Sequence, residues 1–176
     1  MAMTTFQGPV RSLGGFISQG PNTVANLANG TNTITIDESY AGKIITTSDA
    51  TLIITLPTVN VSADPASAGP GADPNNPNNL GVAYFIYIDT TASAVAIKTD
   101  GTDKFVGSIL MIDTDSSDAV TGYAPAASND VINLNGTTTG GIAGSWVKIV
   151  AVASRKYMVE GIVIGSGSVA TPFADS

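Results

Sequence analysis

Short runs in which apolar and polar residues alternate constrain the fold of this chain more than any other feature. In one run, Leu52, Ile54 and Leu56 share one side of an extended segment, and Pro57 then lacks the amide hydrogen that a longer strand would use. Apolar residues at helical spacing are hard to find. The alternation therefore predicts an all-β protein, either an antiparallel β-sandwich or a small β-barrel. The expected strands are residues 33–36, 43–46, 51–56, 83–88, 94–98, 108–112, 131–134, 145–151 and 157–164.

Glycine-containing turns stand beside several of these segments. Asn29-Gly30, Asp100-Gly101 and Asn135-Gly136 are pairs that readily adopt the positive φ of tight hairpins. They favour antiparallel pairing of neighbouring strands. The segments NGTNTITI and NGTTTGGI look alike, but two short stretches do not establish an internal repeat, and we predict no solenoid.

The segment Ala83–Ile88 is apolar on both sides. Tyr84, Ile86 and Ile88 point one way, whereas Phe85 and Tyr87 point the other. Such a strand is either central and covered on both faces or placed at a subunit interface. The sequence leaves these two alternatives open.

The chain divides into an arm and one domain. Residues 1–21 combine glycine and proline with single large apolar residues, which indicates an extended arm that docks either on a neighbouring surface or on its own sheet. Residues 22–176 are expected to form a single β domain. Its Pro/Asn-rich segment 60–79 is predicted to be an exposed loop, either a functional projection or a tolerated insertion.

The composition argues against most catalytic chemistry. The chain has no histidine, no cysteine and only 12% charged residues. Histidine is the commonest proton-transfer group near neutral pH, and histidine and cysteine supply most tight transition-metal sites. A carboxylate pair could still hydrolyse a glycoside, but the sequence singles out no such pair. We therefore expect a protein that is not an enzyme and has no catalytic residue, metal site or cofactor.

One cluster of carboxylates has the composition of a cation site. Asp113, Asp115 and Asp118 lie close together in the segment DTDSSD, and calcium prefers oxygen ligands. A full EF-hand loop also needs a glycine and a terminal glutamate, and Ala119 and Val120 follow instead. We interpret these aspartates as solvated loop residues.

The net charge and hydropathy bear on partners. A formal charge of −7 and a pI near 4.1 repel phosphate backbones, so nucleic acid is not an expected partner. No apolar run approaches the ~18 residues of a membrane span, and the start of the chain lacks the pattern of a signal peptide. We expect no membrane association.

Four motifs carry a resemblance to a known family. FQGPVRSLGGFISQGP near the start, ITLP at residues 54–57, GGIAGSWVKIV at 140–150 and GIVIGSGSVATPF near the end together resemble decoration, or cement, proteins of tailed bacteriophage heads. The resemblance spans most of the chain, and the Pro/Asn-rich stretch 63–79 looks like a local insertion against that pattern. It implies a structural virion protein, often a homotrimer, that binds the major capsid protein on the capsid exterior and stabilises the mature shell by bridging capsomers.

On this reading the two ends of the chain make the contacts. Arg11 is expected to pair with an acidic capsid surface, and Phe173, a large apolar residue near the C-terminus, is the expected oligomer contact. The full set expected at the capsid is Phe6, Pro9, Val10, Arg11, Leu13 and Phe16.

The alternative is a receptor-binding or adhesive β domain of a virion fibre. Exposed loops would then engage a host glycan. Glycan sites usually combine exposed aromatic residues with neighbouring carboxylates and amides, and loop 60–79 offers amides but no aromatic residue.

Overall fold

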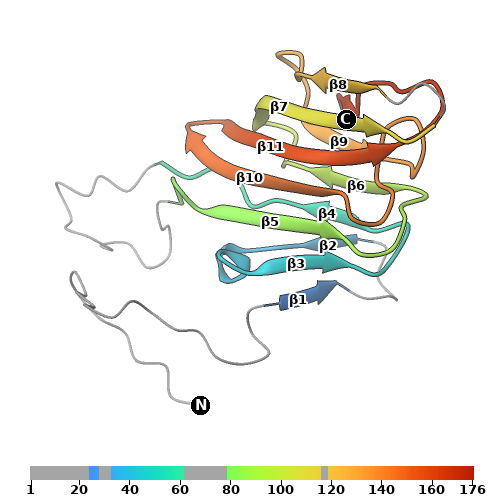
Figure 1. Ribbon diagram of the computed structural model, residues 1–176. Helices are drawn as coiled ribbons and strands as arrows, with labels where there is room; N and C mark the ends of the chain where they lie inside the picture. The colour runs from blue at the N-terminus through green and yellow to red at the C-terminus, as the bar shows by residue number, and fades with distance from the viewer. Residues whose placement is uncertain (1–23, 28–32, 62–78, 116–118) are drawn as a thin grey trace, which may run out of the picture.

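Two β-sheets pack against each other to form the protein (Figure 1). The computed structural model describes residues 24–27, 33–61, 79–115 and 119–176. One sheet has seven strands in the order β1-β3-β5-β10-β11-β7-β8, and the other has five in the order β12-β9-β6-β4-β2. The predicted all-β sandwich is confirmed, and the two sheets do not join into a closed barrel. The strands are β1 Val24–Leu27, β2 Thr33–Thr35, β3 Ile44–Thr47, β4 Ile53–Thr55, β5 Ala83–Ile88, β6 Val95–Lys98, β7 Lys104–Asp113, β8 Val120–Tyr123, β9 Val131–Leu134, β10 Trp146–Ala153, β11 Lys156–Gly165 and β12 Phe173–Ala174.

Every strand predicted from the alternation is present, and the described ranges add three more. The additions are β1, β8 and β12, which all lie at the edge of a sheet. Edge strands are paired on one side only, so they are short and need not carry a strong apolar pattern. Gly122 within β8 weakens its pattern further. The alternation therefore identified all the central strands and the edge strand β2, and missed the three other edge strands.

The first six strands alternate between the two sheets. β1, β3 and β5 pair in parallel in the seven-stranded sheet, and β2, β4 and β6 pair in parallel in the five-stranded sheet. Twenty residues separate Val24 from its partner Ile44, and the same spacing separates Thr33 from its partner Ile53. The third coil is longer because residues 62–78 lie between β4 and β5. This half of the protein is thus a coil of three turns, a feature that the alternation and the turn residues do not predict.

The pairing is accordingly mixed rather than purely antiparallel. Two of the glycine turns explain the difference, because Asp100-Gly101 connects β6 to β7 and Asn135-Gly136 connects β9 to β10, and each connection runs from one sheet to the other. Asn29-Gly30 lies outside the described residues. A tight hairpin joins β10 to β11, and there the positive φ belongs to Arg155 instead of a glycine.

Rows of side chains across the sheets build the core. In the five-stranded sheet, a row of isoleucines faces the other sheet and ends at a phenylalanine, in the order Ile34, Ile54, Ile97, Ile132 and Phe173. All but Ile34 are buried. Because parallel and antiparallel neighbours both keep side chains in register, the same face of each strand lines the interior.

Candidate interaction surfaces

The predicted capsid-binding residues lie outside the described part of the chain. Phe6, Pro9, Val10, Arg11, Leu13 and Phe16 all precede residue 24, where the description begins. Their role stays a prediction. The segment that carries them leads into β1, which is an edge strand of the seven-stranded sheet.

Phe173 packs within its own chain. It lies in β12, which pairs antiparallel with β9, and its side chain is buried. The centre of its ring is 6.5 Å from that of Phe105, and the rings are tilted by 50°. This geometry places the phenylalanine in the core, while its predicted role as an oligomer contact stays untested.

The outward side of the seven-stranded sheet is unusually apolar. Along each strand, buried residues alternate with residues that are partly or fully exposed, and the second set points away from the core. Leu110 is 47% exposed, Ile112 38% and Val120 66%. We define the outer apolar face as the outward side chains Trp146, Ile162, Ile164, Leu110, Ile112 and Val120.

Strand register makes this face continuous. Trp146 pairs with Ile162, and Ile162 pairs with Leu110 on the next strand. One step along, Ile112 pairs with both Ile164 and Val120. Directly opposite residues on one face of a sheet are in contact range. The outer apolar face is therefore one patch, whereas exposed apolar residues on an ordinary surface are scattered singly.

Aromatic and charged residues border the patch. The rings of Phe85 and Trp146 are stacked with centroids 5.4 Å apart and an interplanar angle of 16°. Beside them, the Lys148 ammonium and the Glu160 carboxylate form an ion pair of 3.0 Å. Both charged side chains are about half exposed, so the ion pair itself contributes little to stability.

The outward side of the five-stranded sheet is different. Its exposed positions are mostly small or polar, as in the row Thr33, Ile53, Ala96 and Asn133 and in the neighbouring Thr35 and Thr55. This composition is what a water-facing sheet normally carries. The contrast shows that the apolar character belongs to one face and is not a general property of the surface.

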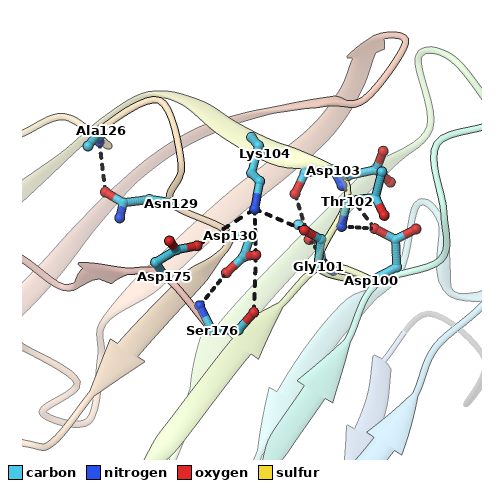
Figure 2. Close-up of polar contacts among 11 residues, drawn as sticks. Asp100, Gly101, Thr102, Asp103, Lys104, Ala126, Asn129, Asp130, Asp175 and Ser176 are labelled. Carbon is cyan, nitrogen blue, oxygen red and sulfur yellow. Dashed lines mark hydrogen bonds and ion pairs between the residues drawn. The ribbon is translucent and has the colours of Figure 1, made fainter.

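A polar cluster lies beside the start of β7 (Figure 2). Asp130 is buried, and its carboxylate accepts hydrogen bonds from the Lys104 ammonium at 2.7 Å and from the Ser176 amide at 2.9 Å. Burial works to raise the pKa of Asp130, but these hydrogen bonds and the Lys104 charge outweigh it and hold the pKa below its ordinary value. Hydrogen bonding to Asp130 raises the pKa of Lys104 in turn. The cluster fixes the C-terminal residue to the start of β7.

Two further aspartates organise the turn before β7. Asp100 accepts hydrogen bonds from the Thr102 amide at 2.8 Å and from the Thr58 hydroxyl at 2.9 Å. Asp103 is buried and accepts from the Val59 amide at 2.7 Å. Burial is the main cause that raises the pKa of Asp103, and the nearby Asp100 charge adds to it. These carboxylates are occupied in shaping the turn.

The predicted loop carboxylates also have structural partners. The Asp113 carboxylate accepts from the Asp115 amide at 3.2 Å, and the Asp115 carboxylate accepts from the Gly167 amide at 2.9 Å. Asp118 lies outside the described residues. Among those described, no group of three or more acidic residues is arranged to hold a metal ion, and no helix is long and apolar enough to cross a membrane.

Comparison with family models, with curated proteins and with solved structures found no match to this chain.

The sequence contained a signal for the outer apolar face. The segments Trp146–Ala153 and Lys156–Gly165 are apolar on both sides, just as Ala83–Ile88 is. Two apolar sides were predicted only for Ala83–Ile88. Because all three strands share the pattern, it indicates a sheet with a second apolar face.

Proposed function

We propose that this protein is a non-enzymatic structural component of a tailed-bacteriophage virion. It binds the major capsid protein on the exterior of the mature head, as a homotrimer, and stabilises the shell by bridging capsomers. The observation that carries the proposal is the outer apolar face, a continuous exposed apolar patch on a two-sheet body whose edge strand β1 follows the N-terminal segment in the sequence. The four motifs that resemble capsid decoration proteins supply the context.

The proposed mechanism is differential binding. A protein that binds the assembled shell and not the free capsid subunit shifts the equilibrium towards the shell by mass action. Such a protein needs no proton-transfer group, which agrees with a chain without histidine or cysteine. It needs a rigid body, which the packed core supplies, and several attachment points on one particle.

The arm is the proposed capsid contact. Phe6, Val10 and Leu13 are apolar anchors held among glycine and proline, and Arg11 adds a positive charge to a chain of formal charge −7. Ordering an arm costs conformational entropy. Attaching several arms to one oligomer restores affinity through effective concentration.

Cosedimentation with expanded phage heads prepared without this protein tests the proposal. We expect the full chain to bind, residues 22–176 alone to lose binding, and Phe6→Ala/Phe16→Ala to bind more weakly. Gln7→Ala/Gln19→Ala is the matched control in the same arm and should bind normally. Unchanged binding by the folded truncated protein would move the contact away from the arm. A full chain that ignores the heads but binds a glycan array would favour the adhesive fibre domain.

A further inference from the structure

We infer that Asn135-Gly136 is a deamidation site that the fold keeps unreactive, so that the asparagine is modified only when the turn of residues 135–140 opens. In an Asn-Gly pair the backbone amide of the glycine readily attacks the asparagine side chain, because glycine has no side chain to obstruct the approach. Asn135 follows directly after β9 and is exposed to solvent. Sequence and exposure alone would therefore predict rapid deamidation at this position.

The reaction converts an amide into a carboxylate without an oxidant or a reductant. The Gly136 nitrogen loses its proton and bonds to the side-chain carbonyl carbon of Asn135, and the side-chain nitrogen leaves as ammonia. Water then opens the resulting succinimide ring at either carbonyl, which gives aspartate or isoaspartate at position 135. Both products add a negative charge, and isoaspartate also lengthens the backbone by one carbon. The reaction therefore needs a free Gly136 nitrogen and a side chain that can move onto it.

The attacking nitrogen is occupied in the folded chain. The Gly136 amide donates to the Gly140 carbonyl at 2.8 Å, and the Gly140 amide donates to the Thr137 carbonyl at 3.0 Å in the same turn. Gly136 is buried, has a φ of +73°, and packs so closely that an added side chain would collide with the Ala92 carbonyl. Because attack requires the reacting atoms in a defined geometry, the glycine would have to break its hydrogen bond and move within a tightly packed site.

The side chain under attack is held as well. The Asn135 side-chain oxygen accepts from the Thr137 amide at 2.9 Å and from the Thr139 amide at 3.0 Å. Its side-chain nitrogen donates to the Thr138 hydroxyl at 2.9 Å, and the Asn135 backbone amide donates to the Thr139 hydroxyl at 3.1 Å. Rotating the side chain breaks its three bonds. Opening of the turn therefore supplies the reactive form, and the rate follows the fraction of molecules in which the turn is open.

Peptide mapping by mass spectrometry during incubation at about pH 8 tests the inference, with digestion at acid pH to stop the reaction. Asn29-Gly30-Thr31 repeats the tripeptide of residues 135–137 and is an internal reference in the denatured chain. In guanidinium chloride we expect Asn29 and Asn135 to deamidate at similar rates. In the folded protein, Asn135 should deamidate at least about tenfold more slowly than it does in denaturant.

A double variant tests the role of the hydroxyl groups. Thr138→Ala/Thr139→Ala removes two hydrogen-bond partners of Asn135 and keeps the backbone amides of the turn. We expect its folded-state deamidation to be several-fold faster than that of the wild type, with no change in denaturant. Thr33→Ala/Thr35→Ala is the matched control, because both threonines are exposed on β2, away from this turn, and it should deamidate like the wild type.

Hydrogen exchange of the Gly136 amide, followed by NMR, supplies a readout that holds even where a variant is less stable overall. If opening of the turn controls the reaction, exchange of this amide and deamidation of Asn135 should change by the same factor in each variant. Deamidation that varies independently of this exchange would contradict the inference.

Two further results would overturn it. One is a folded-state rate equal to or above the rate in denaturant, since the hydrogen bonds would then not protect Asn135 or would even activate its carbonyl. The other is an equal folded-state rate in Thr138→Ala/Thr139→Ala and its control. Because phage heads take no part in these measurements, their outcome is independent of the test of the proposed function.

Discussion

Two buried tyrosines differ in whether their hydroxyl makes a hydrogen bond, and only the bonded hydroxyl should stabilise the fold. The Tyr157 hydroxyl donates to the Pro57 carbonyl at 2.6 Å, whereas the Tyr84 hydroxyl makes no hydrogen bond within the described residues. Tyr157→Phe leaves a carbonyl unpaired and should lower the free energy of unfolding by about 1 kcal/mol. Tyr84→Phe should be neutral or slightly stabilising. Urea unfolding of both variants measures the difference, and an equal loss in the two would contradict this account.

Two buried aspartates should give stability opposite dependences on pH. The folded-state pKa of Asp130 is lowered, so its contribution is present above the ordinary value of 3.8 and is lost as pH falls through the folded value. Asp130→Asn should therefore cost about 1 to 3 kcal/mol at pH 7 and weaken the acid dependence. Asp103 has a raised pKa, so its charge opposes folding at neutral pH. Asp103→Asn, which can still accept from the Val59 amide, should be neutral or stabilising at pH 7.

Urea unfolding between pH 2.5 and 7 tests the pair. The two variants serve as controls for each other, since both replace a buried carboxylate by an amide. If Asp130→Asn were as stable as the wild type at pH 7, the link from Lys104 to the C-terminal residue would not be a stabilising feature.

At the level of elements, a glycine in β7 allows β11 to approach. Gly107 has a φ of +105°, and a side chain there would meet the Val159 carbonyl of the neighbouring strand. Gly107→Ala should cost at least about 2 kcal/mol, because it combines a strained φ with a displaced strand. Gly122→Ala in β8 is the control, since its added carbon lies 3.7 Å from Leu110, an ordinary contact. We expect a melting temperature about 4 to 8 °C lower for Gly107→Ala and within about 2 °C of wild type for Gly122→Ala. Similar values for the two would mean that β7 and β11 adjust freely.

The sequence predicted strands well and their partners poorly. Alternation reports which side chains share a face, and the segments Ala83–Ile88 and Val131–Leu134 coincide with the observed strands. It does not report which sheet a strand joins. Asp100-Gly101 has the chemistry of a hairpin turn, yet its aspartate caps a crossing between sheets through the Thr102 and Asp103 amides. Local turn chemistry therefore left the parallel coil unpredicted.

At the scale of the whole molecule, the coil explains why a long segment fits between β4 and β5. The two flanks of residues 62–78 are held together, because the Asn79 amide donates to the Asn60 carbonyl at 3.1 Å and the Asn60 amide donates to the Asn79 side chain at 2.8 Å. Asn79 also donates from its side chain to Glu38 at 3.0 Å and to the Thr58 carbonyl at 2.9 Å. The coil thus closes at Asn60 and Asn79 whatever lies between them.

Replacing residues 61–78 by Asn-Gly should therefore preserve the fold. Asn60 and Asn79 would become the first and last residues of a two-residue hairpin turn, and the existing bond from the Asn79 amide to the Asn60 carbonyl would close it. Shortening the loop reduces its closure entropy, so stability should be unchanged or higher by up to about 2 kcal/mol. Asn79→Ala in the full chain should instead lose about 1 to 3 kcal/mol, because Glu38 and the Thr58 carbonyl lose a buried donor.

Urea unfolding of both proteins decides between a tolerated insertion and a structural segment. A shortened chain less stable than Asn79→Ala would show that residues 61–78 contribute to the fold. The same shortened protein then separates the two readings of the loop. Normal binding to phage heads would make the segment dispensable, and loss of binding by a protein of full stability would make it a functional projection.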